Sequence, residues 1–138
     1  MKKKRWTEDC DNLVPLDYIR FLDVPMYSSE YGDVIDVKFG LLEFLAAEAV
    51  LKMGIPIRGL EVKFLRKVAG LSMEKFANKL GLSSGTVFHW EKAAKETLAP
   101  VNEAAVRAFI AETLNVEISS HFSKLVGHAP HRLELKAS

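Results

Sequence analysis

Three histidines and a single cysteine are the side chains most able to bind a metal ion or to act as a nucleophile in this chain. His121, His128 and His131 lie close together in the sequence, and histidine is a common zinc ligand. The segment HAPH contains a proline and no adjacent carboxylate, however, which favours a solvated tail over a metal site. No feature near Cys10 would lower the pKa of its thiol, and the sequence lacks a phosphate-binding glycine loop and a nucleophile elbow. We therefore expect no catalytic residues, no metal and no cofactor, and the chain is not expected to be an enzyme.

The stretch 70–92, GLSMEKFANKLGLSSGTVFHWEK, contains two short helical patterns joined by a glycine. Ser72 and Ser83 each precede one of the patterns, where a serine hydroxyl can accept a hydrogen bond from an unpaired backbone N–H. Gly81 lies between the patterns, where a positive φ costs a glycine nothing. The sequence therefore predicts a helix over Met73–Leu80, a turn at Gly81 and a second helix after Ser83. Two capped helices with such a turn make a helix-turn-helix.

The spacing in the second helix separates an inward face from a surface face. Val87 and Trp90 point inward. The residues nearer the surface are Ser84, Gly85, Thr86, Phe88 and His89.

The pattern L-S-x-E-x-x-A-x-x-L-G-L-S-x-x-T-V-x-x-W-E resembles the helix-turn-helix of Cro/lambda-repressor-type (XRE) proteins. The resemblance extends from Ile57 to about Leu114. It implies a helical bundle whose second motif helix enters the major groove of DNA. The alternative is a helical hairpin that serves only as a core element or as a protein-docking module.

This resemblance implies DNA contacts residue by residue. The expected DNA-binding residues are Ser84, Gly85 and His89 at base edges with Thr86 nearby, Ser72, Met73 and Ser83 near phosphates, and Lys92 and Lys95 along the backbone. The family often has longer polar residues at Ser84 and Gly85, so direct base readout would be sparse and DNA shape would contribute more to specificity. The resemblance also places Arg66 opposite Glu91, as a structural ion pair rather than a DNA contact.

Charge is distributed unevenly along the chain, although the net charge is only +1. Residues 58–98 carry eight basic and four acidic side chains, a net charge of +4, whereas residues 6–57 carry three and ten, a net charge of −7. A basic helical module beside an acidic one suits DNA binding together with a separate protein-facing region. Charged runs are also common on surfaces that only face solvent.

The first forty residues contain two strand-like segments. Asp17–Tyr27 and Asp33–Phe39 are predicted as strands of a hairpin around the turn SSEYG, and Pro25 predicts an edge or irregular position for the first of them. Residues 2–6 are expected to be a terminus without structure, or an arm that reaches DNA.

We expect a mainly α fold, a helical DNA-binding bundle preceded by a small β-hairpin region. The predicted parts are a hairpin region (1–40), an apolar connecting helix (41–56), a DNA-binding domain (57–114) and a carboxyl-terminal extension (115–138).

The amino-terminal part adds a second resemblance, to MqsA-like antitoxin and repressor proteins. Residues 59–67, GLEVKFLRK, are similar to the segment that follows a zinc ribbon in those proteins. Cys10 stands where the first knuckle of the ribbon would have two cysteines, and Ser28 and Tyr31 stand where the second would have its pair. One cysteine cannot supply about four ligands, so the resemblance implies a ribbon without its metal. An unrelated short hairpin is the alternative.

The most direct interpretation is a sequence-specific transcriptional regulator, a repressor, that could also be the antitoxin of a toxin–antitoxin pair. We expect a homodimer on a palindromic operator, formed through the helix at 41–53 or the last helix at 106–114. The alternative is a protein-binding module that neutralises a toxin without reading DNA.

The single cysteine, and a basic start without an apolar segment behind it, indicate a cytoplasmic protein. No apolar run is long enough for a membrane span.

Overall fold

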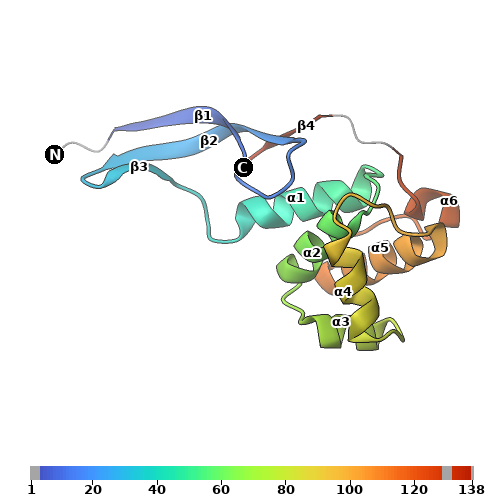
Figure 1. Ribbon diagram of the computed structural model, residues 1–138. Coiled ribbons are helices and arrows are strands. Elements are labelled where there is room, and N and C mark those ends of the chain that lie inside the picture. Colours follow the sequence, from blue (N-terminus) through green and yellow to red (C-terminus); the bar gives the residue numbers. More distant parts are fainter. Residues whose placement is uncertain (1–3, 129–131, 138) are drawn as a thin grey trace. The chain divides into compact units, whose positions relative to one another are not determined.

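The computed structural model describes residues 4–128 and 132–137. These residues form two compact units (Figure 1), the sheet unit of residues 4–46 with 132–137 and the helical unit of residues 47–128. The strands are β1 (Arg5–Asp11), β2 (Ile19–Ser29), β3 (Gly32–Ile35) and β4 (Leu133–Lys136), and the helices are α1 (Leu41–Lys52), α2 (Gly59–Val68), α3 (Met73–Lys79), α4 (Ser84–Lys92), α5 (Pro100–Leu114) and α6 (Phe122–Leu125).

The fold is mixed α/β, which corrects the expected mainly α class. The amino-terminal part is a four-stranded sheet rather than a hairpin alone. The two additional strands, β1 and β4, come from segments near the two chain ends that the sequence predicts as an arm and a tail. Lys2, Lys3 and His131 lie outside the described residues.

β2 is the central strand of this sheet. It pairs antiparallel with β1 and β3 and parallel with β4. The predicted hairpin between β2 and β3 is present. Pro25 predicts an edge or irregular strand: the edge position is wrong, because β2 is paired on both sides, but β2 is irregular near Asp23. Pro25 lies opposite Thr7 of β1, and its carbonyl, on the other side of β2, accepts a hydrogen bond from the N–H of Asp36. On that side Pro25 falls between the segment paired with β3 and the segment paired with β4, so its missing N–H interrupts neither ladder.

An irregularity in β2 keeps one face of this long strand against the core. Ile19 and Phe21 are buried at odd positions, whereas Val24 and Met26 are buried at even positions. The change coincides with a shift of register in the β1–β2 ladder and with a φ of 53° at Asp23. A bulge adds one residue to a strand, so the buried side chains before and after it point to the same face.

Helices α2 to α5 build the core of the helical unit. α3 packs on α4, and α2 packs on both α4 and α5. The buried apolar side chains of this core include Val62, Leu65, Phe76, Ala77, Val87, Leu98, Val106 and Ile110. The ring of Phe76 also lies against that of Phe109, with 5.9 Å between the ring centroids.

The ends of α3 and α4 follow from local sequence. The hydroxyl of Ser72 accepts a hydrogen bond from the N–H three residues later at 3.1 Å, and that of Ser83 does the same at 3.2 Å. Each bond satisfies a donor that the helix itself cannot pair. Gly81 follows α3 with a φ of 71°. Both predicted helix caps and the predicted glycine turn are therefore confirmed.

α2 begins against the segment that follows α4. The N–H groups of Gly59 and Leu60 donate to the carbonyls of Glu96 and Ala94 at 3.1 and 3.0 Å. A Cβ atom built on Gly59 would lie only 1.8 Å from the carbonyl oxygen of Trp90. Glycine is required there because the backbone of α4 comes too close for any side chain. This contact fixes the end of α4 to the start of α2.

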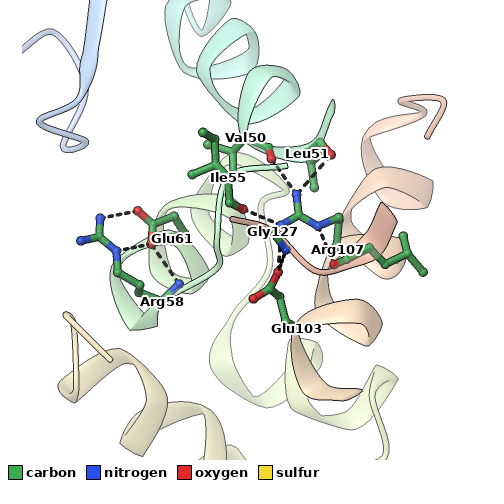
Figure 2. Close-up of polar contacts among 9 residues, drawn as sticks. Val50, Leu51, Ile55, Arg58, Glu61, Glu103, Arg107 and Gly127 are labelled. Carbon is green, nitrogen blue, oxygen red and sulfur yellow. Dashed lines mark hydrogen bonds and ion pairs between the residues drawn. The ribbon is translucent and has the colours of Figure 1, made fainter. Parts of the chain in front are cut away.

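A buried arginine connects α5 to other segments of the helical unit, as Figure 2 shows. Arg107 is fully buried. Its guanidinium donates to the carbonyls of Val50 (2.7 Å), Leu51 (3.2 Å), Leu125 (2.8 Å) and Ile55. Glu103, one turn earlier, lies 3.2 Å from the guanidinium and also accepts the N–H of Gly127. A buried charge is tolerated when it is paired and hydrogen-bonded in this way.

The solvated tail predicted for the segment HAPH is described only in part: His121 and His128 are exposed, and residues 129–131 lie outside the described residues. The segments on either side of HAPH are structured. α6 belongs to the helical unit, and β4 pairs with β2, where Ala137 is 1% exposed. The local sequence could not predict this pairing because its partner lies more than a hundred residues away. None of the described helices is long and apolar enough to cross a membrane.

Candidate nucleic-acid interface

One face of α4 is open to solvent along the whole helix. Its exposed residues are Ser84, Gly85, Phe88, His89 and Lys92, which have the spacing of a single helical stripe. The opposite face carries Val87, which is fully buried, and Glu91, whose side chain is 4% exposed. α4 is therefore anchored from one side and presents polar, basic and aromatic groups on the other.

Four of the predicted DNA-binding residues share this exposed face. These are Ser84, Gly85, His89 and Lys92. Lys95, shortly after the end of α4, is exposed as well. The structure thus brings together the groups expected at base edges and one of the lysines expected at the DNA backbone.

The other predicted residues lie at the starts of α3 and α4. Ser72 and Ser83 are exposed, and their hydroxyls cap the two helices. Met73 is half-buried as the first residue of α3. Thr86 is half-buried too, and its hydroxyl lies 3.0 Å from that of Ser83. Thr86 therefore supports the start of α4 rather than extending its exposed face.

Phe88 belongs to the exposed face but is not among the predicted contacts. Its side chain is 50% exposed, and its ring meets the ring of His89 edge-on, with 6.0 Å between centroids and 69° between planes. The signal was in the spacing, since Phe88 lies four residues after Ser84 and four before Lys92. The sequence thus predicts that Phe88 lies nearer the surface, which the structure confirms, and only its place among the contacts was not predicted.

Arg66 and Glu91 join α2 to the end of α4. The guanidinium Nε and Nη2 donate to the two carboxylate oxygens of Glu91 at 2.7 and 2.9 Å, and Nη1 donates to the carbonyl of Leu71 at 2.9 Å. The side chains of the pair are 10% and 4% exposed. The hydrogen bond with Glu91 raises the pKa of Arg66 above its ordinary value, although burial acts in the opposite direction. The two residues form a bidentate ion pair away from the exposed face of α4.

Replacing Glu91 by alanine should lower the free energy of unfolding of the helical unit by about 3 kcal/mol, because the guanidinium is left nearly buried and unpaired. The DNA binding that the sequence predicts for α4 should weaken as well, even though a negative charge is removed, because the helix loses an attachment. Urea unfolding followed by circular dichroism measures the first effect.

The control is Glu112→Ala, which removes an exposed glutamate from α5 and should change stability by less than about 0.5 kcal/mol. Unchanged stability of the Glu91 variant together with tighter DNA binding would contradict the structural role of the pair.

The ion pairs leave an excess of lysine on the surface of residues 58–98. Arg58 contacts the buried Glu61 at 2.7 Å, and Arg66 contacts Glu91. The exposed charged residues of this segment are Lys63, Lys67, Lys75, Lys79, Lys92 and Lys95 against Glu74 and Glu96. A surface of this composition attracts polyanions, of which the phosphates of nucleic acid are one kind.

The positions compared with zinc knuckles are far apart in the sheet unit. Cys10 pairs near the start of β2, whereas Ser28 is near the end of β2 and Tyr31 is in the turn that follows. These positions could not share a metal ion in this fold. Within residues 4–128 and 132–137, no three histidine, cysteine or acidic side chains are grouped to hold a metal.

The Cys10 thiol is half-buried on β1. Burial, and then the neighbouring carboxylates of Glu8 and Asp9, raise the pKa of this thiol. A higher pKa leaves less thiolate at neutral pH, so Cys10 is a poor nucleophile.

No family model matches the sequence, and no similar curated protein or solved structure was found. What the chain does is therefore inferred from the residues of 70–92 and from the geometry of α2 to α4.

Proposed function

We propose that this protein is a sequence-specific DNA-binding transcriptional regulator, a repressor of the Cro/lambda-repressor (XRE) type, in which α3 and α4 form the helix-turn-helix. The observation that carries the proposal is the exposed face of α4, which is presented by a helix anchored from behind through Val87 and Glu91. In helix-turn-helix proteins the second helix of the motif lies in the major groove with its first residues at base edges. In this proposal α4 is the helix that enters the major groove. We place the protein in the cytoplasm.

The proposed contacts divide by chemistry. Ser84, Gly85 and His89 face base edges, and His89 is the longest side chain among them that can hydrogen-bond. Lys92 and Lys95 contact the DNA backbone, as do the residues at the helix starts, Ser72, Met73 and Ser83. Few long polar groups reach the bases, so phosphate contacts and DNA shape contribute much of the affinity and specificity.

Two contacts hold α4 to α2, and they favour a rigid recognition helix. Gly59 allows the start of α2 to contact the backbone at the end of α4, and the Arg66–Glu91 pair joins the same two helices. A recognition element that is already held at its docking angle loses less entropy on binding.

A dimer is the expected assembly, with two copies of α4 about 34 Å apart on successive major grooves. Val106 and Ile110 of α5 are fully buried within the monomer, so they are not available for an interface. The half-buried apolar side chains of α1, Leu41, Phe44 and Leu45, are the better candidates.

Selection of duplexes from a random-sequence pool by the purified protein tests the proposed function. We expect a palindromic motif whose half-site centres are about 10 base pairs apart. His89→Ala should bind the selected duplex about tenfold more weakly per half-site, because each half-site loses one base-edge contact, and its urea unfolding should be unchanged.

His121→Ala is the matched control, since His121 is also exposed but lies outside α4, and it should bind the duplex like the wild type. A pool that remains random after several rounds would contradict sequence-specific binding. Equal affinity of the wild type and the His89 variant would contradict the role given to α4.

A second candidate function is a protein-binding module that neutralises a basic toxin. The sheet unit favours it, since β1 exposes Glu8, Asp9 and Asp11, and Tyr31 and Phe39 are more than nine-tenths exposed. Acidic surface with exposed aromatic rings suits a basic protein partner. The two functions are compatible in one chain. If no DNA motif is enriched, but the product of a neighbouring reading frame binds and loses its toxicity, the second function replaces the first.

A further inference from the structure

Phe88 places a large apolar ring at a position of α4 that is only partly buried. Its side chain is 50% exposed, whereas the adjacent Val87 is fully buried and holds α4 to the core. A ring that stays half in water contributes only about half of what a fully buried ring would, so folding accounts for only part of this side chain. It lies instead in the middle of the exposed face of α4, four residues from both Ser84 and Lys92.

The turn of α4 before Phe88 carries very small side chains. Ser84 has a short side chain and Gly85 has none. A Cβ atom built on Gly85 would meet only the Ser83 hydroxyl, at 3.8 Å, with nothing else within 4 Å. The fold therefore leaves open space at Gly85, so glycine is not needed there for packing. Short residues at this point let a ligand approach the helix backbone closely and leave Phe88 as the most prominent apolar group.

The ring of His89 lies edge-on beside the Phe88 ring, 6.0 Å away between centroids. The face thus offers one apolar surface and one hydrogen-bonding group side by side. The major groove offers the matching pair of features. Each base exposes hydrogen-bonding atoms there, and thymine alone adds an apolar group, its C5-methyl, which phenylalanine can contact.

We infer that Phe88 is a specificity-determining residue that packs against the C5-methyl group of a thymine in each half-site. This inference rests on the proposed function, because it requires α4 to lie in the major groove. Phenylalanine has no hydrogen-bonding group, so it selects thymine only through this methyl group. Phe88 therefore supplies part of the base readout that the short side chains at Ser84 and Gly85 cannot provide.

The test uses the duplex selected from the random pool, synthesised with deoxyuridine in place of thymidine at one symmetric pair of positions at a time. Deoxyuridine keeps the base pair and its hydrogen-bonding atoms but lacks the methyl group. One such replacement should weaken wild-type binding about fourfold per half-site, the effect of exposing one methyl-sized group. Fluorescence anisotropy measures each affinity.

The Phe88→Ala variant should bind the thymine duplex more weakly than the wild type by about fourfold per half-site or more. It should also bind the thymine and uracil duplexes equally, because the contact is already gone. Phe88→Leu should retain part of the discrimination. Phe122→Ala is the matched control, since Phe122 is 54% exposed on α6, and it should discriminate like the wild type.

The outcomes separate this inference from the proposed function. If the wild type binds the selected duplex specifically but no thymine-to-uracil change weakens it, DNA binding stands and the role of Phe88 is overturned. If the Phe88→Ala variant remains as sensitive to uracil as the wild type, another residue contacts the methyl group and the inference is again overturned. If no duplex is selected, the proposed function itself fails.

Discussion

Replacing Arg107 by leucine should lower the free energy of unfolding of the helical unit by about 4 kcal/mol or more, since breaking a buried charge network is among the most costly substitutions. The substitution removes the donor to the carbonyls of Val50, Ile55 and other buried positions (Figure 2), and it leaves the Glu103 carboxylate without its cation. The carbonyls would lose a buried donor, and the Glu103 carboxylate would keep only the N–H of Gly127. Because the total stability of a domain is only about 5–15 kcal/mol, the leucine variant could fail to fold.

Arg107→Lys keeps the prediction testable in that case. Lysine retains the charge near Glu103 but lacks the planar fork that reaches several carbonyls at once, so it should lose an intermediate amount of stability. Lys63→Leu, at an exposed position on α2, is the control and should change stability by less than about 0.5 kcal/mol. Urea unfolding followed by circular dichroism compares the variants. If the Arg107 and Lys63 variants unfolded at the same urea concentration, the network would have no structural importance.

Replacing Gly59 by alanine should cost about 3 kcal/mol, because the new Cβ atom overlaps backbone atoms of α4 that cannot rotate away. The Cβ would lie 1.8 Å from the carbonyl oxygen of Trp90 and 2.8 Å from that of Ala93. Relief requires α2 and α4 to separate, which also weakens the hydrogen bond from the Gly59 N–H to the carbonyl of Glu96. The same movement would tilt α4, so affinity for the selected duplex should fall with stability.

Gly85→Ala is the matched control, since Gly85 is also in the first turn of a helix but has open space around it. Alanine should stabilise the helix there by up to about 1 kcal/mol, because it restricts the unfolded chain more than glycine does. Thermal unfolding of the two variants should therefore shift in opposite directions. A Gly59 variant with wild-type stability would show that α2 and α4 do not depend on this close contact.

The parts of the fold that follow from neighbouring residues were predictable from the sequence. Ser72, Gly81 and Ser83 act within a few residues of their own positions, so the caps and the turn could be inferred directly. The turn between β2 and β3 likewise depends only on the few residues that form it. Such features depend on backbone chemistry that the residue types specify by themselves.

The remaining features depend on contacts between distant segments. Arg107 lies on the buried side of α5, and its partners are 18 to 57 residues away except for Glu103. The only local signal was the Glu103 spacing, which is equally common in exposed helices. β4 pairs with a strand more than a hundred residues earlier, and the place of Pro25 between the two ladders depends on where β3 and β4 both end.

The candidate site also combines features that follow from local spacing with features that depend on the three-dimensional structure. The helical spacing was enough to place Ser84, Phe88 and His89 near the surface. Lys92 was expected after the recognition helix, but it is the last residue of α4 and shares the exposed face. The half-burial of Thr86 depends on its hydroxyl contact with Ser83 at 3.0 Å, which spacing alone does not predict. The open space around Gly85 also requires the three-dimensional structure.

The central claim is that the exposed face of α4 binds DNA, and amide chemical shifts in the protein during titration with the selected duplex test it most directly. We expect the largest changes at Ser84, Gly85, Phe88, His89 and Lys92, with smaller ones at the starts of α3 and α4 and at Lys95. The amides of the sheet unit should change little, and a scrambled duplex should produce only small shifts that disappear at higher salt. If the largest changes instead occur in β1 to β3 while α4 is unaffected, α4 is not the DNA-binding element and the proposed function is contradicted.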